Sequence, residues 1–135
     1  MAGLHGMNIL IVDDQAIYRD LLTAILEDWP EHQVSSVATG EAALALLQTA
    51  EPRFDLIFLD VSLPGLSGLA VLTQIRAAPL HRSLPVIMCT SASAQSTMTR
   101  AIDLGATNYL IKPCTPEDLA RILRQVGALP DIPAK

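Results

Sequence analysis

Cysteine is scarce in this chain, since only Cys89 and Cys114 occur among its 135 residues. Two cysteines are too few for a disulfide framework, and their spacing is not that of a C-x-x-C motif. This scarcity excludes the class of small secreted domains that disulfides hold together. We therefore expect the protein to work in a reducing compartment, and we predict a cytoplasmic location.

Basic residues are also few, and long apolar runs are missing. Nine Lys and Arg residues stand against 14 Asp and Glu residues, which gives a net charge of −5. This balance argues against direct nucleic acid binding by this chain, because such binding needs clustered positive charge. No apolar stretch approaches the roughly 18 residues of a membrane helix. The first residues, MAGLHG, lack the basic and apolar regions of a signal peptide. We predict no membrane association.

Apolar residues are abundant and make up 50% of the chain. This content and length suit one domain with its own core. We assign residues 7–127 to that domain and treat residues 1–6 and 128–135 as flexible ends. Short apolar runs alternate with helical patterns. The predicted strands cover residues 7–12, 33–38, 54–59, 85–90 and 107–111. The predicted helices cover residues 15–28, 41–50, 67–77, 94–104 and 116–126.

Five repeats of strand and helix predict a parallel sheet between two layers of helices. Right-handed crossover connections leave few topologies for such a sheet. We predict an α/β fold of the flavodoxin-like, doubly wound kind. Its five-stranded parallel sheet would have the order 2-1-3-4-5 and five flanking helices. Ligands of such sheets bind outside the carboxyl ends of the strands.

Polar residues stand at those carboxyl ends, whereas the strand interiors are apolar. Asp13 and Asp14 follow the first predicted strand, and Asp60 follows the third. The fourth strand ends at Thr90, and the fifth leads to Lys112. Three carboxylates at one edge would repel one another, so we expect a divalent cation, and oxygen-only ligands favour Mg²⁺. A metal, a lysine, a hydroxyl and a carboxylate nucleophile suit phosphoryl transfer through an aspartyl phosphate.

Four separated segments together resemble the receiver domain of bacterial two-component response regulators, and of chemotaxis regulators in particular. These segments are the Asp13-Asp14 pair, FLDVSLPG around Asp60, PVIMCTS around Thr90, and LGATNYLIKP at the fifth strand. The resemblance covers residues 8–126 and is specific because the segments agree in order with the rhythm of strands and helices. It implies the doubly wound fold that the apolar pattern predicts.

The resemblance implies that Asp60 is a phosphoacceptor. Its phosphoryl group would come from a sensor histidine kinase or from a phosphotransfer protein, in a Mg²⁺-dependent reaction. Asp14, Asp60 and the backbone carbonyl of Ser62 would bind the metal directly, and Asp13 would act mainly through a metal-bound water. The protein would then be a switch in phosphorelay signalling and not an enzyme, since it would catalyse only its own phosphorylation and dephosphorylation.

The resemblance also implies how the switch would work. Thr90 would move towards the phosphoryl group, Lys112 would pair with it, and the Tyr109 ring would turn inward. The bond between Lys112 and Pro113 would be cis, as is typical of the family. The face formed by the fourth helix, the fifth strand and the fifth helix would change shape. A downstream effector protein, an output domain missing from this chain, or a second copy in a homodimer would bind that face.

Two other functions on similar folds fit the residues less well. A Mg²⁺-dependent phosphohydrolase that forms an aspartyl phosphate usually carries a second carboxylate two residues after the nucleophile, where this chain has Ser62. A flavodoxin-like cofactor binder needs a phosphate loop rich in Ser, Thr and Gly after the first strand, where Asp13 and Asp14 would repel a phosphate. The two acids taken alone could simply cap a helix. Their convergence with Asp60 and Lys112 favours the receiver.

Overall fold

The apolar runs form one parallel sheet in a computed structural model of the chain, which describes residues 6–49, 53–91 and 95–127. The strands are β1 (Asn8–Val12), β2 (Gln33–Val37), β3 (Leu56–Asp60), β4 (Val86–Thr90) and β5 (Asn108–Ile111). Their order is β2-β1-β3-β4-β5, and all neighbours are parallel. The predicted strand order is confirmed.

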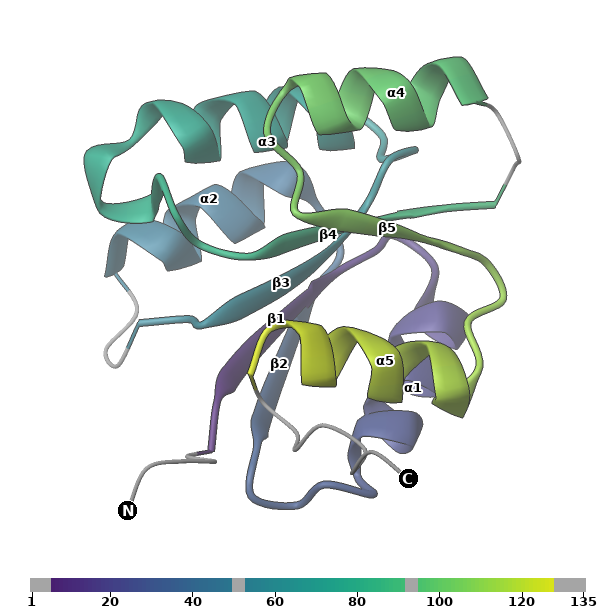
Figure 1. The fold of residues 1–135 in the computed structure, drawn as a ribbon. Helices are drawn as coiled ribbons and strands as arrows, with labels where there is room; N and C mark the ends of the chain where they lie inside the picture. The colour runs from purple at the N-terminus through teal and green to yellow at the C-terminus, as the bar shows by residue number, and fades with distance from the viewer. Residues whose placement is uncertain (1–5, 50–52, 92–94, 128–135) are drawn as a thin grey trace.

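Helices cover both faces of this sheet. They are α1 (Ala16–Leu26), α2 (Gly40–Thr49), α3 (Gly68–Ala77), α4 (Gln95–Asp103) and α5 (Pro116–Gln125). Figure 1 shows α1 and α5 on one face of the sheet and α2, α3 and α4 on the other. This arrangement confirms the doubly wound α/β fold. A short 3-10 helix, η1 (Pro79–His81), follows α3 and has no counterpart among the predicted elements.

The predicted and observed element boundaries differ by at most two residues. The largest consequence is at β3, which begins at Leu56 and includes Asp60, so the acid is the last residue of the strand itself. The predicted helix ends at Ala50 and Ala94 lie outside the described residues, as do residues 1–5 and 128–135 of the predicted flexible ends. None of the helices in the described ranges is long and apolar enough to span a membrane.

Successive side chains of a strand point to opposite faces of the sheet, so the core consists of two layers, one on each face. Ile9 and Ile11 of β1 pack with residues of α1 and α5. Leu10 and Val12 pack with residues of α2 and α3 on the other face. All residues of β3 and β4 are buried, as expected of central strands covered on both faces. This core holds the carboxyl ends of the strands in place.

The start of α3 packs directly against the end of β3. A Cβ atom on Gly68 would clash with the carbonyl oxygen of Asp60 and would lie 2.8 Å from the Cα atom of Val61. Only glycine permits so close an approach of the two backbones. The Gly68 N–H donates a hydrogen bond to the Val61 carbonyl oxygen at 3.0 Å, and the Ser67 side chain caps the helix. The helix therefore holds the backbone that carries Asp60.

Replacement of Gly68 by alanine tests this packing. Because the added methyl group must displace the backbone at Asp60, we expect Gly68→Ala to lower the free energy of unfolding by about 1 to 3 kcal/mol. Chemical denaturation of both proteins measures the difference. Thr73→Ala on the exposed side of the same helix is the control and should change stability by less than about 0.5 kcal/mol. Equal stability of the Gly68→Ala and native proteins would contradict the prediction.

Candidate functional site

The carboxyl ends of the strands bring the predicted polar residues to one edge of the sheet. Asp13 follows β1, Asp60 ends β3, and Thr90 ends β4. In the sheet register Leu59 lies beside Val12, and Asp60 lies beside Cys89, the residue before Thr90. Parallel strands place these ends at a common edge, which is where doubly wound sheets bind their ligands.

Three carboxylates meet at this edge. One oxygen each of Asp13, Asp14 and Asp60 lies within 4.8 Å of the other two. Asp13 and Asp60 are buried, with 2% and 4% of their surface exposed, whereas Asp14 is exposed to solvent. Like charges this close raise the free energy of the site unless a cation compensates them.

Lys112 supplies part of that compensation. Its Nζ atom lies 2.6 Å from Oδ2 of Asp13 and 3.4 Å from Oδ2 of Asp60. The three side chains are at most 6% exposed, so water contributes little to their solvation. The backbone N–H of Lys112 donates to the Thr90 carbonyl oxygen at 2.7 Å, and the following bond, Lys112–Pro113, is cis. The lysine is thus held both by its backbone and by its ammonium group.

Backbone N–H groups orient the two buried carboxylates. Oδ1 of Asp13 accepts a hydrogen bond from the Gln15 N–H at 2.9 Å, and Oδ1 of Asp60 accepts one from the Ser62 N–H at 3.1 Å. In both cases the donor lies two residues after the acid, which is the pattern of an Asx turn. The second oxygen, Oδ2, faces Lys112 in both residues. Each carboxylate therefore has one oxygen bound to its own loop and one directed at the ammonium.

Burial and charge shift the pKa values of this group in the directions that such a cluster predicts. Burial raises the pKa of Asp60, and the charge of Asp13 adds to the increase, while the Ser62 N–H and Lys112 oppose it; the pKa is raised overall. Burial lowers the pKa of Lys112, but the hydrogen bonds and charges of Asp13 and Asp60 outweigh it, so that the pKa is raised. Lys112 therefore remains a cation at neutral pH.

The residues at this edge fit a divalent metal ion. The cluster holds three carboxylates, and one ammonium contacts two of them, so an excess of negative charge remains. All the side-chain donors are oxygens, which hard cations such as Mg²⁺ prefer, and the exposure of Asp14 leaves room for the waters that Mg²⁺ retains. Ser62, the residue expected to offer its backbone carbonyl, is exposed directly after the end of β3.

The predicted switch residues lie in two different environments. Thr90 is buried, 7% exposed, beside Lys112 at the end of β4. Tyr109 of β5 is 37% exposed and lies away from the acids, in a surface pocket of about 240 Å³ that it shares with Met98, Thr99 and Ile102 of α4. The structure therefore brings Thr90 to the acidic cluster and leaves Tyr109 outside it.

Two contacts that α1 makes with this site were not predicted from the sequence pattern. Helical spacing places Tyr18 in the apolar stripe of α1, yet the Nζ atom of Lys112 lies 4.3 Å from the centroid of its ring. Arg19 donates a hydrogen bond from Nη1 to the carbonyl oxygen of Asp13 at 2.7 Å. The only signal in the sequence was the position of Tyr18 and Arg19, which lie about one helical turn after Asp13 and Asp14 in the helix that follows these acids.

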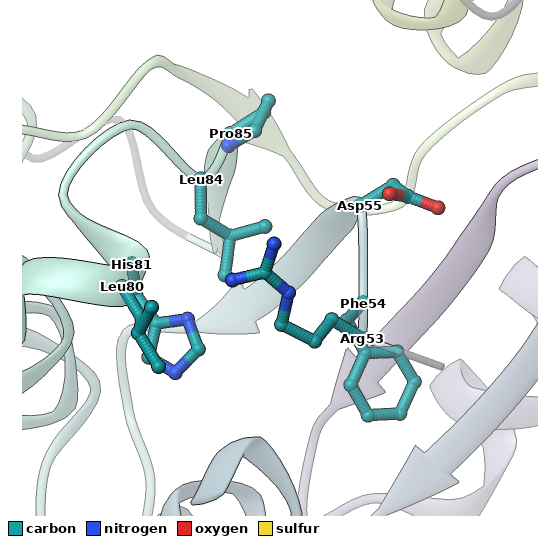
Figure 2. Close-up of a pocket in the computed structure, with 7 residues that line it drawn as sticks. All are labelled: Arg53, Phe54, Asp55, Leu80, His81, Leu84 and Pro85. Atoms are coloured by element: carbon teal, nitrogen blue, oxygen red, sulfur yellow. The ribbon is translucent and has the colours of Figure 1, made fainter. Parts of the chain in front are cut away.

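A separate hollow lies at the amino-terminal ends of β3 and β4, and no residue of the acidic cluster lines it. It has a volume of about 220 Å³ and is lined by Arg53, Phe54, Asp55, Leu80, His81, Leu84 and Pro85. These residues precede β3 and β4 or lie around η1. Figure 2 shows the Arg53 side chain extending into this hollow, whereas Asp55 is turned away from it.

Known proteins are similar to this chain in both sequence and fold. The model of the response regulator receiver domain matches residues 9–124. The cyclic di-GMP phosphodiesterase response regulator RpfG of Xanthomonas campestris pv. campestris (strain 8004) is 36% identical over 115 residues, which cover 84% of this chain and 30% of that protein. This chain therefore spans less than a third of that relative.

Two solved structures are similar over most of their length. A putative response regulator from Chloroflexus aurantiacus J-10-fl has a TM-score of 0.84 and 30% identity, and the match covers 91% of this chain and 98% of that one. The receiver domain of the sensor histidine kinase PA1611 from Pseudomonas aeruginosa PAO1 has a TM-score of 0.80 and 31% identity, covering 90% and 98%. That structure contains a magnesium ion coordinated in the active site cleft.

The raised pKa of Asp60 predicts a pH-dependent effect of its removal. When the pKa of an acid is higher in the folded than in the unfolded protein, its contribution to stability is full below the ordinary pKa and is lost as the pH rises through the raised value. Without divalent cations at pH 7, we therefore expect Asp60→Asn to have a higher free energy of unfolding than the native protein. The gain should disappear near pH 3.

Thermal and chemical denaturation across that pH range measures the effect. Asp103→Asn is the control, because it removes the same charge from an exposed position outside the acidic cluster. Added Mg²⁺ should stabilise the native protein more than Asp60→Asn, because the variant has lost a ligand. A variant that is less stable than the native protein at pH 7 without metal would contradict the prediction.

Proposed function

This chain belongs to the family of response regulator receiver domains, and we propose that it is a phosphorylation-controlled switch with Asp60 as its phosphoacceptor. The observation that carries the proposal is the position of the Asp60 carboxylate, which lies 3.4 Å from the Lys112 ammonium and beside two further carboxylates. The donor would be the phosphohistidine of a sensor histidine kinase or of a phosphotransfer protein. Such a transfer requires a nucleophile and compensating positive charge at the phosphoryl group.

The transfer can be described from the groups present. An oxygen of the Asp60 carboxylate attacks the phosphorus atom, the P–N bond to the donor histidine breaks, and the leaving imidazole takes up a proton. The Lys112 ammonium stabilises the negative charge on the phosphoryl oxygens, and the Thr90 hydroxyl donates a hydrogen bond to one of them. Asp13, Asp14, Asp60 and the carbonyl of Ser62 would hold a Mg²⁺ ion, which adds positive charge at the phosphoryl group when bound.

The same residues favour a switch over an enzyme that acts on other substrates. A hydrolase with an aspartyl phosphate needs a general acid close to the nucleophile, and the residue two positions after Asp60 is Ser62. The Ser62 N–H is hydrogen-bonded to Asp60 itself. We propose that this chain catalyses only its own phosphorylation and dephosphorylation. We also propose a cytoplasmic location, which the two free cysteines favour.

The response would reach partners through the face formed by α4, β5 and α5. This face carries three exposed apolar side chains, Ile102, Tyr109 and Ile111, which are 45%, 37% and 42% exposed. A phosphoryl group adds about −1.5 to −2 charges next to Thr90 and Lys112. Thr90 gains a charge-assisted hydrogen bond by moving towards it, and the space that Thr90 leaves admits the Tyr109 ring. The partner is an effector protein, an output domain or a second copy of the chain.

Covalent modification tests the phosphoacceptor. With acetyl phosphate and Mg²⁺, we expect intact-mass spectrometry to show the addition of one phosphoryl group to the native chain and none to Asp60→Asn. Asp103→Asn, which removes an exposed acid outside the cluster, should be modified like the native chain. Chelation of the metal should reduce the rate by at least about tenfold, since three carboxylates would then face the phosphoryl group with Lys112 alone. Modification that persists in Asp60→Asn would refute the assignment.

Tyr109 reports on the switch. We expect beryllofluoride with Mg²⁺, which imitates the phosphoryl group, to move the Tyr109 ring inward from its 37% exposure. A soluble paramagnetic agent should then broaden the ring resonances of Tyr109 less than in the free protein. Thr90→Ala should abolish the change, whereas Thr73→Ala on α3 should retain it. If Tyr109 moves equally in Thr90→Ala, the two residues are not coupled.

A further inference from the structure

Tyr18 of α1 makes an unusual contact with the Lys112 ammonium. The ring centroid is 4.3 Å from Nζ, well inside the distance of about 6 Å at which a cation and an aromatic face attract each other. Tyr18 is only partly exposed, and the Lys112 side chain is 6% exposed, so little water screens the attraction. The contact joins a helix that carries none of the predicted site residues to the central cation.

The ammonium is enclosed by three groups. Asp13 lies 2.6 Å from Nζ, Asp60 lies 3.4 Å from it, and the face of the Tyr18 ring covers a further part of its surface. A lysine side chain has four flexible methylene carbons and a strongly hydrated head, so it moves towards water unless it is confined. The carboxylates attract the ammonium, and the ring occupies space into which it could otherwise withdraw.

The chain also ties Tyr18 to Asp13. The backbone N–H of Gln15, just before α1, donates to Oδ1 of Asp13, and the Arg19 guanidinium donates to the Asp13 carbonyl oxygen at 2.7 Å. Tyr18 lies between these two anchors in the first turn of the helix. Hydrogen bonds on either side of Tyr18 thus link its backbone to Asp13, whose carboxylate contacts the same ammonium as the Tyr18 ring.

We propose that Tyr18 is a positioning residue that confines the Lys112 ammonium beside Asp60 before a phosphoryl group arrives. The proposal rests on the phosphoacceptor function of Asp60 for its effect on rate, but the confinement itself is a property of the unmodified protein. A cation already in place does not have to reorganise during the transfer, and such preorganisation accelerates charge-stabilised reactions. Tyr18 thereby sets how readily this receiver is phosphorylated.

Two variants separate the aromatic face from the phenol hydroxyl. Tyr18→Phe keeps the aromatic face and loses the hydroxyl. Tyr18→Leu keeps an apolar side chain of similar bulk but removes the aromatic face. Tyr18→Met is a second apolar replacement should the leucine variant fold poorly. With acetyl phosphate and Mg²⁺, we expect Tyr18→Phe to be phosphorylated at the native rate and Tyr18→Leu about three- to tenfold more slowly. Ile17→Ala is the matched control, because the neighbouring Ile17 side chain is 74% exposed and should leave the rate unchanged.

The NMR signals of Lys112 test the confinement without any phosphorylation. The Hε protons of Lys112 should be shifted upfield by the ring in the native protein and in Tyr18→Phe, and this shift should be lost in Tyr18→Leu. Relaxation of the Lys112 Cε signal should show greater mobility in Tyr18→Leu alone. Unchanged shift and mobility in Tyr18→Leu would overturn the proposal, even if the native chain accepted no phosphoryl group and the phosphoacceptor assignment failed.

A double-mutant cycle ties the effect on rate to the lysine. In the Lys112→Ala background, which retains Asp60 and the acids, Tyr18→Leu should cause no further loss of phosphorylation rate. If Tyr18→Leu slows the reaction by the same factor whether or not Lys112 is present, Tyr18 acts by another route and the proposal is wrong.

Discussion

The ion pair between Lys112 and the carboxylates of Asp13 and Asp60 is the interaction on which the rest of the site depends. Two carboxylates withdrawn from water beside each other would be costly without a cation to compensate their charge. The ammonium reduces this repulsion and remains charged, because both carboxylates raise its pKa. The unmodified protein therefore already holds a compensating positive charge next to both carboxylates.

The parallel sheet explains why these charged groups lie close together. Parallel strands end at the same edge, so residues that are 47 positions apart in sequence, Asp13 and Asp60, come within reach of one another. The backbone then fixes the direction of each carboxylate through N–H groups two residues farther on. Gly68 allows α3 to approach the end of β3, so packing of the helix layer reaches the backbone of Asp60 directly. Stability and site geometry are thus coupled.

The position of Lys112 also connects the acidic edge to the outer face. Its backbone N–H is bonded to the carbonyl oxygen of Thr90, and it follows directly after β5, the strand that carries Tyr109. Lys112, which contacts the Asp60 carboxylate, therefore connects the ends of β4 and β5. Exposed apolar side chains on α4 and β5 lie on the surface that these strands support. A phosphoryl group can bias this surface only through such differential contacts.

The sequence by itself was enough to predict the strand order, the edge at which the acids gather and the presence of Lys112 beside them. It could do so because apolar periodicity reports burial, and because charged residues at the ends of buried strands are rarely placed there without a partner. Only the tertiary structure decided that Tyr18 faces Lys112, that Asp60 belongs to β3 and that Gly68 admits α3. Helical spacing shows which side of a helix is inward, but not which group it meets there, because that partner comes from a distant part of the chain.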